Sequence, residues 1–198
     1  MELKKLFLGL LLASVTFGQV SAQTFRFGLE AGGGISNFSG ADAKNLSGSL
    51  SSRIGLVGGL FLQLNFGDSF AIQPEVLYAQ KGSQTTSGSN NSTFDLSYVE
   101  IPVLLKLYLP TPGIKPNIFA GGAVGFNTAA NLVASGTPSA IANISSSDVG
   151  VIGGVGVDID KFSISGRYEL GLTKVSTSTT GSDIQNGTIS VMLGYSFM

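Results

Sequence analysis

The chain has no cysteine and no histidine among its 198 residues. Without cysteine it can form neither disulfide bonds nor thiolate metal sites, and without histidine it lacks the commonest general base and metal ligand. No serine stands in the Gly-x-Ser-x-Gly pattern of a nucleophile elbow. These absences disfavour an enzyme with an activated nucleophile, and we expect no catalytic residue, no metal site and no cofactor.

Charge is scarce as well. Charged residues make up 12% of the chain, about half the share of an average soluble domain, while hydrophobic residues make up an ordinary 43%. The formal net charge is −1, so the chain lacks the basic excess that a nucleic-acid partner would require. A water-soluble protein this poor in charge would struggle to cover its surface.

Long apolar runs are missing from most of the chain. Beyond the first residues, no stretch approaches the roughly 18 continuous apolar residues of a transmembrane helix. The one apolar run, Leu6–Phe17, is shorter than that; it follows Lys4 and Lys5 and precedes Val20–Ala22. A positive start, a short apolar stretch and small residues are the features of a secretory signal peptide.

We therefore expect a signal peptide over residues 1–22, cleaved between Ala22 and Gln23, with residues 23–198 exported as one domain. An uncleaved anchor helix is the alternative, but the length and flanks of the run are wrong for it. No cysteine follows the run, which excludes anchoring as a lipoprotein.

Eight segments of the remaining chain alternate apolar residues with small or polar ones, which is the two-residue period of a β-strand. The segments are Phe25–Ile35, Arg53–Leu64, Ser69–Lys81, Phe94–Leu109, Lys115–Asn127, Asp148–Asp158, Phe162–Thr173 and Thr188–Met198. Each reaches the roughly 9–11 residues that a membrane-spanning strand needs. Pro74 and Pro102 fall inside two of them, where we expect a local bulge or a missing ladder bond.

The connections between these segments alternate in length. The short ones are Asn65–Asp68, Pro110–Ile114 and Asp158–Asp160; the long ones are Asn37–Ser52, Ser83–Thr93, Thr128–Ser147 and Lys174–Gln185. An even number of strands, with the short turns at one end and aromatic residues near the strand ends, is typical of bacterial outer-membrane barrels. A soluble β-sandwich or a secreted soluble barrel would show charges on its outer face.

We therefore expect an all-β fold: an eight-stranded antiparallel transmembrane β-barrel in the outer membrane, an up-and-down meander. It would be monomeric and surrounded by outer-membrane lipid, with both termini on the periplasmic side.

Nine charged residues fall on the face opposite the apolar one: Arg26, Glu30, Arg53, Glu75, Lys81, Glu100, Lys106, Arg167 and Glu169. The interior of an eight-stranded barrel is just wide enough for side chains to fill it, and charges buried there must pair. We interpret the nine as a structural network of ion pairs that fills the lumen, with Arg167 as its hub at mid-depth. A gated ion or proton path along the same residues is the alternative.

Two other sequence patterns have structural rather than functional explanations. The glycine-rich stretches Gly32–Gly34, Ala120–Gly125 and Gly153–Gly156 could suggest phosphate-binding loops, but none opens a predicted helix or is accompanied by a suitably spaced lysine. Glycine in a strand more often marks a bend or a close approach of backbones. Asp158 and Asp160 could suggest a calcium site, yet aspartate is a usual occupant of tight turns.

The long connections are rich in serine, threonine, asparagine and glycine, as in Ser83–Ser92 and Ser176–Ser182. They are either the place where an external ligand binds or a flexible hydrophilic surface. We expect a non-enzymatic envelope protein, a scaffold or surface-interaction module whose partners, such as other envelope proteins, meet these loops. The alternative function is a narrow transport or conductance pathway.

Three segments carry a family resemblance. Tyr98–Lys106 resembles the Tyr-x-Glu-Ile-Pro-Leu-Leu-Leu-Lys strand of PorT-like outer-membrane barrels of the Bacteroidetes, and Gln73–Gly82 is similar to the family's Gln-Pro-Glu-Leu-x-Tyr-x-x-Lys-Gly strand. Arg167–Thr173 is similar to its penultimate strand. The resemblance implies an eight-stranded outer-membrane barrel in which Pro74 and Pro102 are normal features. As an alternative function, it implies an accessory role in protein secretion.

Overall fold

The computed structural model describes residues 23–39, 49–87, 90–109, 111–134, 137–140, 145–173 and 185–197. In these ranges the regular secondary structure is β-strand throughout. The strands are β1 (Gln23–Ser39), β2 (Ser49–Phe66), β3 (Phe70–Ser87), β4 (Asn90–Tyr108), β5 (Ile114–Ala134), β6 (Thr137–Ala140), β7 (Ser147–Ile159), β8 (Phe162–Gly171) and β9 (Gln185–Ser196). In the part of the chain so described, no helix is long and apolar enough to cross a membrane. The expected signal peptide, residues 1–22, lies outside the described residues.

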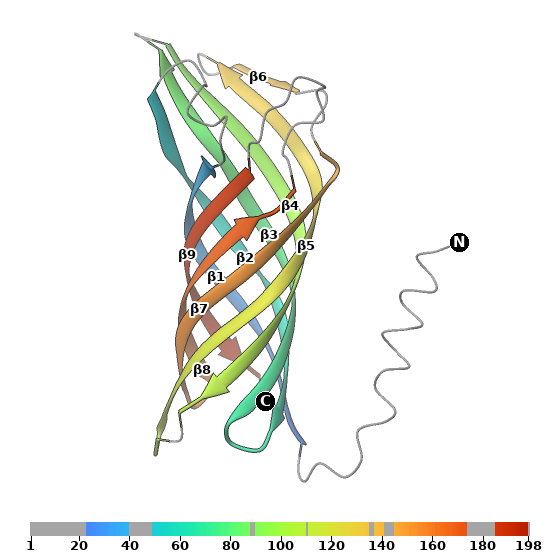
Figure 1. Cartoon of the computed structure of the whole chain (residues 1–198), viewed down its shortest axis with the longest axis vertical. Coiled ribbons are helices and arrows are strands. Elements are labelled where there is room, and N and C mark those ends of the chain that lie inside the picture. Colours follow the sequence, from blue (N-terminus) through green and yellow to red (C-terminus); the bar gives the residue numbers. More distant parts are fainter. Residues whose placement is uncertain are drawn as a thin grey trace, which may run out of the picture.

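Eight of the strands form a closed antiparallel barrel (Figure 1). Each pairs with its neighbour in the chain, β1 pairs with β9, and β4 pairs with β5, so the ring has no break. The predicted eight-stranded antiparallel barrel is therefore confirmed. The short strand β6 is an addition that pairs only with the last residues of β5, Asn131–Ala134.

The two-residue alternation of the sequence determines whether a side chain points outward or into the lumen. In β4, Ile101, Val103 and Leu105 are exposed on the outer wall, whereas Glu100 and Lys106 on the other face are buried in the lumen. Large apolar side chains are exposed around the whole wall, up to 77% for Ile54. Such a continuous apolar belt would be a liability in water and is the surface that a barrel presents to lipid.

The lumen is less polar than its glycine and serine content indicates. Leu104, Phe119, Ala123 and Ile152 point inward from β4, β5 and β7 and form a buried apolar cluster. The ring of Phe119 lies over Gly154, at a place where a side chain on residue 154 would collide with it. Inward glycines therefore make room for large neighbours, and part of the lumen is a packed hydrophobic core.

Three tight connections lie at one end of the barrel, which we call the short-turn end. Gly67, Gly113 and Asp160 stand in them with φ values of 67°, 80° and 51°. This left-handed conformation favours glycine and is tolerated by aspartate, as expected for these turns. Strand β1 begins at this end, since Gln23 pairs with Phe66 next to the first turn.

The connections at the opposite end differ from the prediction. The expected loop Ser83–Thr93 is wrong, because β3 runs to Ser87, β4 begins at Asn90, and these two residues are paired. Strand β6 and the end of β5 likewise occupy part of the expected loop Thr128–Ser147. Figure 1 shows β3, β4 and β5 rising past the ends of β8 and β9. Polar residues make up the extensions of β3 and β4, so no apolar alternation marks them. The end of β5 differs, since Leu132, Val133 and Ala134 are consecutive apolar residues.

The two strand prolines leave the register unchanged. In the β2–β3 pairing, a gap that holds Pro74 lies between the pairs Phe61–Glu75 and Leu64–Ile72. In the β3–β4 pairing, a gap that holds Pro102 lies between the pairs Pro74–Val103 and Leu77–Glu100. The register is the same on both sides of each gap, so the expected bulge is absent, and the interrupted pairing agrees with the other expectation, a missing ladder bond at a residue without an N–H to donate. One irregularity of the β4–β5 pairing lies instead between Ser97 and Tyr98.

Candidate functional site: the barrel lumen

Arg167 of β8 holds two carboxylates in the middle of the lumen. Its Nη1 lies 2.8 Å from Oε2 of Glu75, and its Nη2 lies 3.3 Å from Oε2 of Glu30. All three side chains are buried, and they come from β8, β3 and β1. We call these residues the Arg167 triad. It joins strands that are not neighbours in the sheet, so it braces the barrel across its interior.

A second buried cation, Lys81 of β3, also lies between two carboxylates. Its Nζ is 2.5 Å from Oε1 of Glu100 on β4 and 2.6 Å from Oε1 of Glu169 on β8. We call these residues the Lys81 triad. In each triad one cation faces two carboxylates, which lets charge-assisted hydrogen bonds satisfy groups that would be costly to bury alone.

The two triads connect the same pair of strands with opposite polarity. In one, Glu75 of β3 meets Arg167 of β8; in the other, Lys81 of β3 meets Glu169 of β8. A shift of one strand that brought Glu75 opposite Glu169 would place two carboxylates together. A shift that brought Lys81 opposite Arg167 would place two cations together. The arrangement therefore favours one alignment of β3 and β8 across the lumen.

The remaining three predicted residues belong to neither triad. Arg53 pairs with Asp95 at 2.6 Å toward the end opposite the short turns. Arg26 pairs with Asp158 at 3.4 Å near the short turns. Lys106 is buried and makes no ion pair with any residue that the structure describes; its electrostatic neighbours include Asp158, Glu75 and Glu30. Arg26 and Arg53 thus lie toward opposite ends of the barrel, while Lys106 lies between the Arg167 triad and Asp158.

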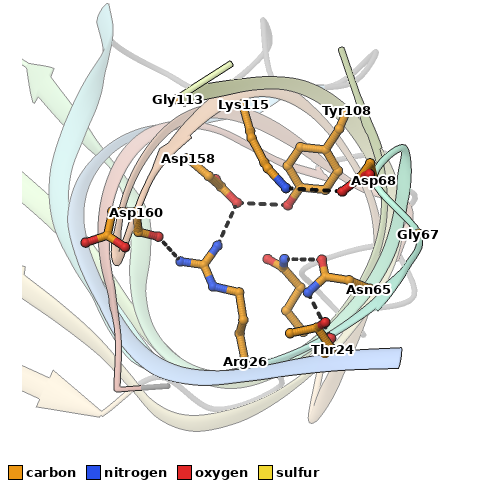
Figure 2. Close-up of a pocket in the computed structure, with 11 residues that line it drawn as sticks. Thr24, Arg26, Asn65, Gly67, Asp68, Tyr108, Gly113, Lys115, Asp158 and Asp160 are labelled. Atoms are coloured by element: carbon orange, nitrogen blue, oxygen red, sulfur yellow. Dashed lines mark hydrogen bonds and ion pairs between the residues drawn. The ribbon is translucent and has the colours of Figure 1, made fainter. Parts of the chain in front are cut away.

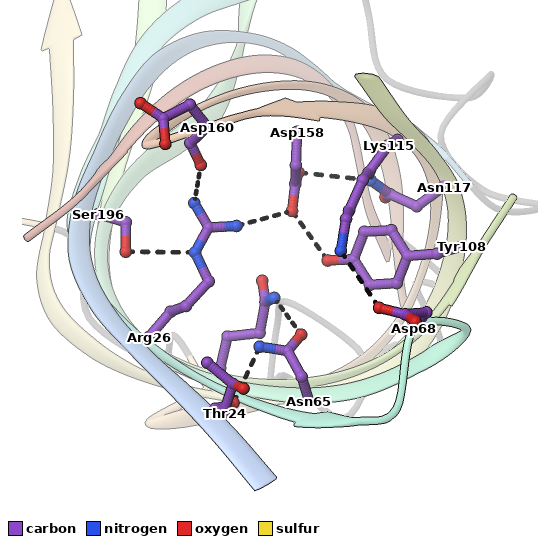
Figure 3. Close-up of polar contacts among 11 residues, drawn as sticks. Thr24, Arg26, Asn65, Asp68, Tyr108, Lys115, Asn117, Asp158, Asp160 and Ser196 are labelled. Carbon is purple, nitrogen blue, oxygen red and sulfur yellow. Dashed lines mark hydrogen bonds and ion pairs between the residues drawn. The ribbon is translucent and has the colours of Figure 1, made fainter. Parts of the chain in front are cut away.

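Asp158, which the sequence pattern places in a turn, is the acceptor for three side chains inside the barrel. It accepts a hydrogen bond from the Tyr108 hydroxyl at 2.8 Å and another from the Asn117 amide at 3.4 Å, in addition to its ion pair with Arg26 (Figure 3). The carboxylate is buried and belongs to β7. Its inward position follows from the alternation of β7, but its partners on β1, β4 and β5 do not. Asp160 does occupy a turn.

A polar pocket of about 470 Å³ opens at the short-turn end, and Arg26 and Asp158 line it (Figure 2). A separate, much smaller cavity of about 20 Å³ lies in mid-lumen, and its lining includes Lys81, Glu100, Arg167 and Glu169. The pocket and this cavity share no lining residue, so the pocket does not continue into the middle of the barrel. Among the described residues, no group of three or more His, Cys, Asp or Glu side chains is placed to hold a metal ion.

Comparisons with known proteins agree with this architecture. The family model described as "Outer membrane protein beta-barrel domain" matches residues 17–177. The crystal structure of Neisserial surface protein A superposes with a TM-score of 0.52 at 16% sequence identity, covering 86% of this chain and 97% of that one. At this identity the likeness shows the fold alone. No curated protein matches the sequence.

Two further solved structures are similar over most of their length. OprG from Pseudomonas aeruginosa has a TM-score of 0.47 and 13% identity, over 87% of this chain and 94% of that chain. Ail from Yersinia pestis has a TM-score of 0.46 and 15% identity, over 87% and 99%.

Proposed function

The chain belongs to the outer membrane protein β-barrel domain family, and we propose that within this membrane it is a non-enzymatic surface-interaction or scaffold protein with a filled lumen. Its apolar belt faces lipid, and its partners meet the end of the barrel opposite the short turns. That end carries the extensions of β3, β4 and β5 as well as β6. Binding residues are commonly carried by segments that a rigid scaffold positions at one end.

One observation carries this proposal: the middle of the lumen is occupied. The cavity found there has a volume of about 20 Å³, which is near the lower limit for a single water molecule. The Arg167 and Lys81 triads surround this space with paired charges. A solute would have to separate these pairs to pass, and this supports a bracing role for the network rather than a transport path.

Finer assignments rest on the sequence motifs. Tyr98–Lys106 and Gln73–Gly82 support membership of the PorT-like group of the Bacteroidetes, and with it an accessory role in secretion as the second candidate function. The N-terminal pattern supports cleavage of a signal peptide between Ala22 and Gln23. Periplasmic placement of the short-turn end follows the usual arrangement of such barrels.

The absence of cysteine makes the proposal testable by site-specific labelling. Ser87→Cys places a thiol at the end of β3 opposite the short turns, and Asp68→Cys places one in the first short turn. In intact cells, a membrane-impermeant maleimide should label position 87 and should reach position 68 only after the outer membrane is permeabilised. A photocrosslinker at position 87 should then capture a reproducible partner, whereas one at position 68 should not.

Two results would contradict the proposal. Labelling of position 68 alone in intact cells would invert the orientation. Partners captured only from position 68 would move the interaction surface to the short-turn end.

A further inference from the structure

The blind pocket at the short-turn end has no part in the function proposed above. We propose that it is a binding site for a neutral, hydroxyl-rich ligand, such as a terminal sugar unit of a glycan. Its volume of about 470 Å³ falls in the usual range of small-molecule sites, about 300–1,000 Å³. Because the middle of the lumen is packed, the pocket would hold the end of such a ligand and would not let it pass.

Every residue that lines the pocket is polar, charged or glycine. The lining comprises Thr24, Arg26, Gln63, Asn65, Gly67, Asp68, Tyr108, Gly113, Lys115, Asp158 and Asp160. In Figure 2 the tips of the labelled Arg26, Asp158, Tyr108 and Lys115 side chains converge on the open centre of the barrel. An apolar ligand would leave these groups without partners, which is costly when they are desolvated.

The charges of the pocket compensate one another. Arg26 pairs with Asp158, and Lys115 lies 3.7 Å from Asp68. The remaining acid, Asp160, turns its carboxylate away from the pocket in Figure 2 and offers only its backbone carbonyl, which accepts a hydrogen bond from Arg26. No uncompensated charge of the lining is left to attract an ion, and this favours a neutral ligand over an anion or a cation.

The polar groups are held in place before any ligand arrives. The Gln63 amide donates to Oδ1 of Asn65 at 2.6 Å, and the Asn65 amide donates to the backbone carbonyl of Thr24 at 2.9 Å. On the opposite side, Nε of Arg26 donates to the Ser196 hydroxyl at 3.3 Å. Binding to a fixed set of donors and acceptors avoids the entropy cost of ordering them.

Hydroxyl groups are the chemistry that this lining matches. A hydroxyl both donates and accepts hydrogen bonds, so adjacent hydroxyls can meet an alternation of amide, carboxylate and guanidinium edges. Lys115 and Asp68 form the entrance, with side chains 53% and 90% exposed. A surface pair of this kind contributes little stability, so it can separate to admit a ligand and then supply one donor and one acceptor.

The test uses the full-length barrel in lipid nanodiscs, free of sugar detergents. Saturation-transfer NMR is recorded with cellobiose and N,N′-diacetylchitobiose, and with glycylglycine and inorganic phosphate as charged probes. We expect transfer to at least one disaccharide and none to the charged probes. Gln63→Ala should weaken the affinity for that disaccharide about fivefold or more, the equivalent of one lost hydrogen bond. Gln80→Ala, a half-buried glutamine outside the pocket, is the matched control and should bind like the parent.

Folding of each variant is checked by its gel mobility before and after heating, and Lys115→Ala, which removes an exposed donor at the entrance, is a second variant if Gln63→Ala fails to fold. Absence of transfer to both disaccharides would overturn the proposal. So would preferential binding of phosphate or glycylglycine, or equal affinities for the Gln63 and Gln80 variants. None of these results depends on the loops at the opposite end.

Discussion

At the scale of single residues, Arg167 is the side chain that joins three strands in the middle of the lumen. It is buried and serves both Glu30 and Glu75. Removal of a buried cation leaves its carboxylates without compensation, and this costs more than the original pair contributed. A neutral residue at position 167 should therefore be far more harmful than the loss of an ion pair near a barrel rim.

We predict that Arg167→Met destabilises the barrel by about 3–5 kcal/mol, measured by urea unfolding in micelles. The control is Arg53→Met, because Arg53 pairs with Asp95 where both side chains are partly exposed; it should cost about 1 kcal/mol or less. Equal losses in the two variants would mean that the Arg167 triad does not brace the barrel.

Tyr108 provides a second residue-scale prediction. Its hydroxyl donates to the buried carboxylate of Asp158, so Tyr108→Phe should cost about 1.5–3 kcal/mol, as for a hydrogen bond to a charged group. Tyr78→Phe is the matched control, since the Tyr78 hydroxyl donates to the neutral Ser97 on the outer wall; about 0.5–1.5 kcal/mol is expected. The two variants are compared by urea unfolding, and a larger loss at Tyr78 would contradict the role given to Asp158.

The sequence predicts which residues face the lumen, but it does not predict which of them form ion pairs with one another. The two-residue period placed Arg167, Glu30 and Glu75 inward and at similar depth. It did not separate them from Glu100 and Glu169, which belong to Lys81 instead. The partners of Arg167 are 92 and 137 positions away in the chain. Their contact depends on the tilt and stagger of the closed sheet, which no local pattern encodes.

At the scale of strands, apolar alternation defines a strand only where one face is covered by lipid and the other by the lumen. This is why the spanning parts of all eight barrel strands were predicted, whereas the extensions of β3 and β4 to Ser87 and Asn90 were not. Beyond the belt both faces are polar, and backbone pairing continues without a pattern in the side chains.

Glycines of the barrel strands should differ in their tolerance of substitution. A methyl group at Gly121 of β5 would meet the backbone of Val103 and Leu104 on β4, whereas one at Gly166 of β8 would meet no atom within 4 Å. We predict that Gly121→Ala costs about 1–3 kcal/mol through overpacking and that Gly166→Ala is tolerated. The stability of both variants is measured by thermal unfolding monitored by circular dichroism. Equal stability of the two variants would show that β4 and β5 can move apart at little cost to accept the methyl group.

At the scale of the molecule, the barrel combines an apolar outer belt, a packed middle and one open pocket. The belt accounts for its place in the membrane, and the two triads with the apolar cluster at Leu104 account for the closed lumen. A connection between the two ends would require separation of several buried ion pairs at once. We therefore expect a closed barrel whose two ends act as separate surfaces, rather than a channel that connects them.

Single-channel recording in planar bilayers tests this closed lumen most directly. We predict that the purified barrel, with insertion verified by labelling of the Ser87→Cys variant, produces no steady unitary conductance at neutral pH over voltages of either sign. Reproducible unitary steps from the folded parent protein would contradict the filled lumen and would favour the transport pathway instead.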